Sequence, residues 1–196
     1  MLMNLRNAMM TGKKIPYLQL SEGVVFIASM QGVGRIVVDF TNDNDVETTS
    51  SKYLCGFGFS SYQYYDYRGG SGSSENWINY VGRVLTTDGK PHRLEWEDSQ
   101  PGTIDGVIVR PNWKVAFGNN NLCVGYVRYA GVSWGNTWTG KIFRVELYDS
   151  SDALISRFVP DKSGTLKNEA TGTLCTKVGT ATYGEGNFVL PMATAS

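Results

Sequence analysis

Two groups of aromatic side chains beside polar ones are the part of this sequence most suited to ligand chemistry. A sugar presents apolar C–H faces next to hydroxyl groups, so a site for it needs a flat ring with amide, carboxylate or guanidinium partners at the edge. Tyr62–Tyr67 holds four tyrosines in six residues, and Trp134–Trp138 holds two tryptophans in a loop bounded by glycine. These segments predict a glycan site with the candidate residues Tyr65, Tyr67, Arg68, Trp77, Trp134, Asn136 and Trp138.

Both aromatic groups also have a purely structural interpretation. Alternate residues of a strand face opposite sides of a sheet, so Tyr62 and Tyr64 could be the buried set of their strand. Tryptophans in a loop can equally close the end of a sandwich. A sugar platform and a core plug therefore both remain open for Trp134 and Trp138.

The titratable residues favour no known catalytic arrangement. Glu95 and Glu97 share one face of a predicted strand, so they could form a catalytic pair of carboxylates, but this candidate has little support. His92 is the only histidine, and no Gly-x-Ser-x-Gly elbow or phosphate-binding loop is present. We expect a protein that is not an enzyme, with His92 packed and hydrogen-bonded, and we rank a glycoside hydrolase last.

Metal and disulfide sites have little support either. The loop Asn42–Asp45 gathers oxygen ligands that suit calcium, but it lacks the glycine and distal glutamate of an EF-hand, so a solvated turn is favoured. Cys55, Cys123 and Cys175 are odd in number and far apart, which predicts buried thiols rather than a zinc site or disulfides. We expect no cofactor, with calcium as the alternative.

Composition narrows the class of protein further. Eighteen basic residues balance eighteen acidic ones, which argues against a nucleic-acid partner. The longest apolar run, Val24–Ala28, is too short to span a bilayer, and the N-terminus lacks a signal peptide's apolar stretch. We therefore expect cytoplasmic synthesis without signal-peptide export. Extracellular work would need another route, such as a virus particle.

The elements that must position these residues are strands. Residues 1–14 carry four methionines and no strand-like alternation, which predicts a short N-terminal arm. From Ile15 onward, β-branched and aromatic runs alternate with turn signals such as Asp88-Gly89, so residues 15–196 are predicted to form one all-β domain. The expected strands include 34–40, 53–59, 77–86, 93–97, 103–109, 114–117, 122–127, 140–148, 153–159 and 187–189.

Three segments resemble one superfamily when taken in order. Asp88–Trp96 is similar to a "DG-x-W/P-H" strand of laminin-G-like and concanavalin A-like sandwiches, and Thr139–Tyr148 resembles a late "G-k-I" strand of the same group. Leu154–Pro160, with the later Ala170–Thr173 and Gly179–Thr182, resembles the tail of small phage and prophage proteins, as does Pro16–Gln19 near the start.

The resemblance implies an antiparallel two-sheet jelly-roll sandwich of the concanavalin A-like type. Glucanases of that superfamily use an E-x-D-x-x-E strand, which is absent here. The implied function is a non-catalytic lectin-like module of a phage or prophage virion that recognises a bacterial surface glycan. The alternative is a virion decoration or assembly protein that docks through its N-terminal arm. By analogy with phage fibres, a homo-oligomer is possible.

Overall fold

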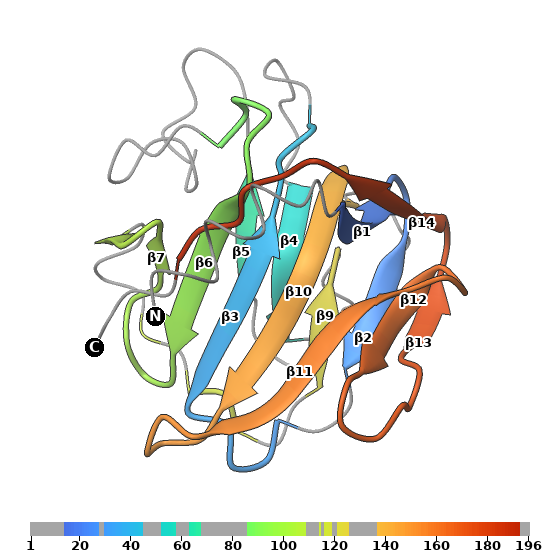
Figure 1. Ribbon diagram of the computed structural model, residues 1–196. Coiled ribbons are helices and arrows are strands. Elements are labelled where there is room, and N and C mark those ends of the chain that lie inside the picture. The colour runs from blue at the N-terminus through green and yellow to red at the C-terminus, as the bar shows by residue number, and fades with distance from the viewer. Residues whose placement is uncertain are drawn as a thin grey trace, which may run out of the picture.

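The computed structural model describes residues 14–27, 30–44, 52–57, 63–67, 86–108, 114, 116–118, 121–125 and 137–192. These residues form antiparallel strands in two facing sheets and contain no helix, which confirms the predicted all-β sandwich and is consistent with the jelly-roll type (Figure 1). The strands are β1 (Ile15–Leu20), β2 (Val24–Ile27), β3 (Arg35–Phe40), β4 (Lys52–Phe57), β5 (Gln63–Tyr67), β6 (His92–Glu97), β7 (Thr103–Ile104), β8 (Val107–Ile108), β9 (Leu122–Val124), β10 (Gly140–Tyr148), β11 (Leu154–Asp161), β12 (Thr165–Asn168), β13 (Thr176–Val178) and β14 (Ala181–Gly186).

The described strands divide into a nine-stranded and a five-stranded sheet. The larger one, here called sheet A, runs β12-β11-β10-β3-β6-β7-β8, and β1 joins it by pairing with both β10 and β14. The smaller one, sheet B, runs β13-β2-β9-β4-β5. One side of sheet A therefore faces sheet B, while its other side, the outer face, is available to position a site.

The core lies between the two sheets and follows the period of two expected for strands. In β3, Ile36, Val38 and Phe40 are fully buried. They pair across the sheet with Leu147, Val145 and other buried β10 residues. Cys55 and Cys123 are also buried, as expected, whereas Cys175 is only half-buried.

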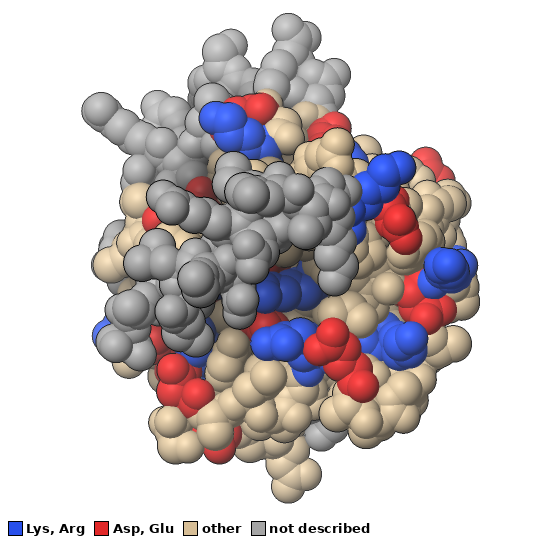
Figure 2. Space-filling model, in the orientation of Figure 1, with Lys and Arg blue, Asp and Glu red and all other residues tan. Residues whose placement is uncertain are grey.

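The outer face of sheet A carries a row of paired charges, here called the charge ladder: Arg93, Asp39, Arg144, Glu146 and Arg157. Arg93 donates from Nε and Nη2 to the two Asp39 carboxylate oxygens, at 2.8 and 3.1 Å, and Arg144 donates to the same carboxylate. Glu146 accepts from Arg157 Nε at 2.7 Å. Figure 2 shows basic and acidic side chains interspersed over the visible described surface, so no single-sign patch forms there.

A C-terminal segment, residues 187–192, leaves β14 and crosses the outer face of sheet A toward β6 (Figure 1). The Phe188 ring packs edge-on against Phe143 and Tyr17, with centroids 4.9 and 5.7 Å away. Pro191 and Met192 then reach the start of β6. The prediction of a strand at residues 187–189 was therefore wrong. The strand in this region is β14, which ends at Gly186, and the residues after it contact the sheet through their side chains.

The predicted arm at residues 1–14 falls almost entirely outside the described residues, since only Lys14 is described. The assignment of residues 15–196 to one domain stays a prediction. In the part of the chain that the structure describes, no helix is long and apolar enough to cross a membrane.

Candidate functional site

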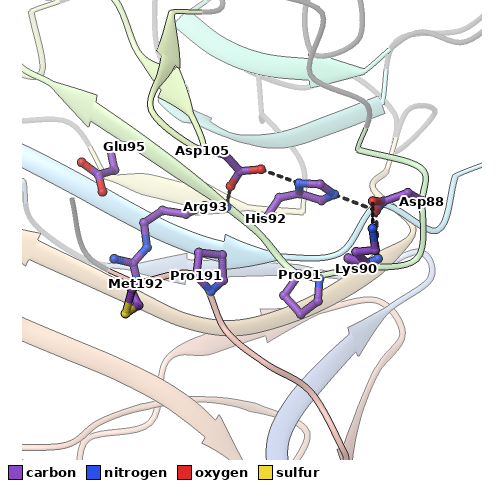
Figure 3. Close-up of a pocket in the computed structure, with 9 residues that line it drawn as sticks. All are labelled: Asp88, Lys90, Pro91, His92, Arg93, Glu95, Asp105, Pro191 and Met192. Atoms are coloured by element: carbon purple, nitrogen blue, oxygen red, sulfur yellow. Dashed lines mark hydrogen bonds and ion pairs between the residues drawn. The ribbon is translucent and has the colours of Figure 1, made fainter. Parts of the chain in front are cut away.

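A groove of about 430 Å³ opens on the outer face of sheet A at the beginning of β6 (Figure 3). Its polar wall comes from residues around the start of β6 and from the β7–β8 turn, and its apolar wall from two prolines and the C-terminal segment. The lining residues are Asp88, Lys90, Pro91, His92, Arg93, Glu95, Asp105, Pro191 and Met192.

Two Asp-Gly turns, one before β6 and one between β7 and β8, each supply a carboxylate to the polar wall. Asp88 accepts a hydrogen bond from the Lys90 backbone N–H at 3.0 Å, and Gly89 has a φ of +76°. Asp105 (φ +50°) and Gly106 (φ +79°) form the two-residue loop between β7 and β8. Positive φ at both positions matches the tight hairpin turn that Asp-Gly favours. The predicted single strand at 103–109 is thus a hairpin.

The side chain of His92 bridges these two carboxylates, an arrangement here called the histidine clasp. Nδ1 lies 2.7 Å from an Asp105 oxygen and Nε2 lies 3.0 Å from Asp88 Oδ1 (Figure 3). The imidazole is buried and its ring lies 6.0 Å from that of Phe40. The prediction that His92 is a packed, hydrogen-bonded residue is confirmed.

The clasp changes the acid–base behaviour of its members. Burial on its own would lower the pKa of His92, but the hydrogen bonds to Asp105 and Asp88 outweigh burial and raise it. Burial likewise opposes ionisation of Asp88, yet hydrogen bonds from Lys90 and His92 lower the pKa of Asp88 to about 2. The clasp therefore extends the pH range over which His92 is protonated upward, and the range over which Asp88 is ionised downward.

We expect the clasp to make stability depend on pH in a defined direction. Histidine in an unfolded chain has a pKa of about 6.5. Because the pKa of His92 is higher in the folded protein, its stabilising contribution is complete below about pH 6.5 and is lost as the pH rises through the folded-state pKa. Asp88 acts in the opposite direction, because its pKa is lower in the folded protein. Its stabilising contribution is complete at a pH above the ordinary pKa of aspartate and is lost as the pH falls toward about 2.

The measurement is urea unfolding of wild type and His92→Gln at about pH 6 and about pH 9. Loss of charge-assisted hydrogen bonds should cost the variant about 1.5–3 kcal/mol at the lower pH, and the difference should shrink at the higher pH. His92 is the only histidine, so no other imidazole confuses the comparison. A difference that is independent of pH would contradict the protonated clasp.

The remaining charged residues of the groove are also paired. Lys90 Nζ lies 3.2 Å from Asp88, and Arg93 belongs to the charge ladder. Glu95 lies 3.8 Å from Arg35, which also contacts Asp152 at 2.6 Å. The groove thus combines carboxylate oxygens that can accept further hydrogen bonds with an apolar wall that can receive C–H groups.

The predicted glycan residues fall into three groups. The prediction that Trp138 contacts a glycan was wrong. Its side chain is fully buried, its ring packs edge-on against Phe40, and its Nε1 donates to the Thr41 carbonyl at 3.2 Å. It is a core plug and cannot stack on a sugar. Tyr65 and Tyr67 lie on β5, but their side chains are outside the described part. The other predicted residues outside the described part are Arg68, Trp77, Trp134 and Asn136.

The Asn42–Asp45 loop is not the solvated turn that the sequence favoured, and the calcium alternative stays a prediction. Asn42 and Asn44 are buried, not solvated, and Asn42 Oδ1 accepts two hydrogen bonds from Asn44. Asp43 pairs with the Lys141 ammonium at 2.8 Å, and Asp45 is outside the described residues. Among the residues that the structure describes, no group of three His, Cys, Asp or Glu side chains could hold a metal.

From the sequence, His92 and Glu95 were considered individually, but the groove that they line was not predicted. Asp105, Pro191 and Met192 were not singled out, and Asp88 was noted only as a turn residue. A usable signal was present, because Asp-Gly occurs on both sides of the β6 segment. The sequence around residues 191–192 does not indicate that they line a groove, because only the path of the C-terminal segment brings these residues to β6.

Comparison with known proteins supports the fold. No family model matches the chain, and no curated protein matches it. Among solved structures, the chain is similar to a protein from Bacteroides ovatus ATCC 8483 that is named as a candidate carbohydrate binding protein. The TM-score is 0.57 at 11% identity, covering 91% of this chain and 62% of that protein. The chain therefore spans less than two thirds of that protein, and the likeness shows a shared sandwich fold.

Proposed function

We propose that this protein is a non-catalytic carbohydrate-binding module and that the groove beside the histidine clasp is its site. The observation that carries the proposal is the clasp itself, which fixes two carboxylates, Asp88 and Asp105, next to an apolar wall in one groove. The shared fold with a candidate carbohydrate binding protein supports the same class of function.

The arrangement meets the needs of a sugar ligand. Each carboxylate oxygen can accept more than one hydrogen bond, so Asp105 can accept from sugar hydroxyls while it still holds His92. Pro91, Pro191 and Met192 offer apolar contacts for the C–H face of the ring. A groove of about 430 Å³ lies within the range of roughly 300–1,000 Å³ that is typical of small-molecule sites.

The acids of the groove suit binding better than hydrolysis. A general acid works best with a pKa near the working pH, whereas the pKa of Asp88 is lowered to about 2. Glu95 is paired with Arg35, and Glu97 is exposed at the end of β6. These features support a binding role over a glycoside hydrolase that uses Glu95 and Glu97.

The biological setting that we propose is the one implied by the sequence resemblance. The module belongs to a phage or prophage virion and recognises a glycan of the bacterial surface. The aromatic residues predicted from the sequence remain predicted contributors to binding. They include Tyr65, whose side chain is outside the described part, and Trp77 and Trp134, which lie wholly outside it.

The test is a glycan-array screen of the whole chain with bacterial capsular and cell-wall polysaccharides. Met192→Lys should lower the signal of a hit at least about tenfold, because it places a charge in the apolar wall. Met192 is exposed, so this change should leave folding intact. Asp161→Ala, which alters a turn carboxylate on another strand, is the matched control and should bind normally.

Two outcomes would contradict the proposal in different ways. A screen with no reproducible hit would overturn carbohydrate binding. A hit that is unaffected by Met192→Lys but lost in Trp134→Ala would keep the function and move the site from the groove to the loop aromatics.

A further inference from the structure

We infer that the groove selects neutral, hydroxyl-bearing sugars and discriminates against acidic ones such as uronates and sulfated sugars. This inference rests on the proposed function, because it names the class of ligand for the same site. It follows from which charged groups of the groove are buried and which are exposed.

The arginine of the groove is not available to an anion. The side chain of Arg93 is 4% exposed, and Asp39, which it contacts through two hydrogen bonds, is completely buried. An acidic sugar could claim this guanidinium only by displacing Asp39, which would leave a buried carboxylate without that partner. Such a displacement carries a large desolvation cost.

The side chain of His92 is likewise not available to an anionic ligand. His92 is 7% exposed and lies between Asp88 and Asp105, whose side chains are 23% and 36% exposed. The positive charge therefore sits behind two carboxylates, and a ligand entering the groove meets the carboxylate oxygens first. A hydroxyl can donate to those oxygens, whereas a ligand carboxylate or sulfate would be repelled by them.

One cation of the groove is well exposed. Lys90 is 77% exposed, and it is already 3.2 Å from Asp88. An exposed ion pair of this kind contributes little binding energy and is screened by salt. Lys90 thus does not make the groove an anion site. A cationic sugar also gains little, because Lys90 and His92 already lie beside the two clasp carboxylates.

Charge count agrees with the exposure pattern. The groove is lined by three acidic residues, Asp88, Glu95 and Asp105, and three basic ones, Lys90, His92 and Arg93. Even with His92 counted as a cation, the groove has no net positive charge to attract an acidic polymer. Binding should then depend on hydrogen bonds and apolar contact, which respond weakly to salt.

The experiment compares one neutral oligosaccharide with its acidic counterpart. The strongest neutral hit of the array is titrated against wild type by calorimetry, together with the same oligosaccharide oxidised to the uronate. Titrations are run at about 20 mM and about 500 mM salt. We expect the neutral form to bind at least about tenfold more tightly than the uronate, with an affinity that changes less than about twofold with salt.

Two variants separate the contributions of the exposed charges. Lys90→Ala should change neutral binding less than about twofold, because its ammonium is not part of the recognition. Asp105→Asn should narrow the preference for the neutral form, since it removes the most exposed carboxylate of the clasp. If Asp105→Asn does not fold, Glu95→Gln serves the same purpose.

The outcomes distinguish this inference from the proposed function. Array hits that are mainly acidic, tighter binding of the uronate, or a steep fall of affinity with salt would overturn the selectivity while leaving carbohydrate binding intact. Absence of binding to every glycan would overturn the proposed function and the selectivity with it.

Discussion

Replacing Asp39 by alanine will lower the free energy of unfolding by about 3–5 kcal/mol, because it leaves a buried cation without its partner. Asp39 is completely buried and accepts hydrogen bonds from both Arg93 and Arg144. Arg144 is partly exposed and can turn to solvent, but the side chain of Arg93 is only 4% exposed. The measurement is urea unfolding at neutral pH.

The matched control is Asp43→Ala, which removes a carboxylate from the more exposed pair with Lys141. Exposed pairs contribute about 0–1 kcal/mol, so this variant should stay close to wild type. A double variant, Asp39→Leu with Arg93→Leu, should recover most of the loss, since apolar residues often replace a buried ion pair without penalty. Equal effects of Asp39→Ala and Asp43→Ala would contradict a buried ladder.

Trp138→Ala is expected to destabilise the protein by about 3–5 kcal/mol, the usual cost of emptying a buried tryptophan site. The ring packs against Phe40, and Nε1 donates to the Thr41 carbonyl. Gly140 allows this close packing, since a Cβ there would lie 2.1 Å from the Thr41 oxygen. Thermal unfolding of the variant measures the effect.

Trp138→Phe is the informative companion, because it keeps an aromatic ring and removes the indole N–H. It should recover part of the stability. At a temperature where the variants stay folded, neither should weaken glycan binding. A folded Trp138→Ala protein that specifically loses its glycan would contradict the core position of this side chain.

The alternating pattern made much of sheet A predictable. The strand expected at Gly140–Tyr148 matches β10 at both ends, because its apolar residues recur with a period of two and its flanks are polar. β3 was predicted to within one residue from a different signal, the β-branched run Ile36-Val37-Val38 followed by the polar cluster at residues 41–45. The Asp88-Gly89 turn was also identified correctly, because the preference of this pair for a tight turn is local.

The errors arose where burial depends on distant residues. Trp138 follows a glycine-bounded loop and looks like a surface aromatic, but its depth is set by Phe40 and Thr41, which lie far away in the sequence. The second Asp-Gly pair, at Asp105-Gly106, was read through as strand because β-branched residues flank it. The groove forms only when both turns and the pairing of β6 with β7 are in place, so no single segment of the sequence predicts it.

The pairing of β1 with β14 has a consequence for how the chain folds. Ile15 lies opposite Gly186, so strands from near the two ends of the chain are neighbours in the same sheet. β1 cannot complete its pairing until β14 has been synthesised, and closing so long a loop costs chain entropy before any contact repays it. Folding of this sandwich is therefore slow, and the β1 edge of sheet A stays open until β14 docks.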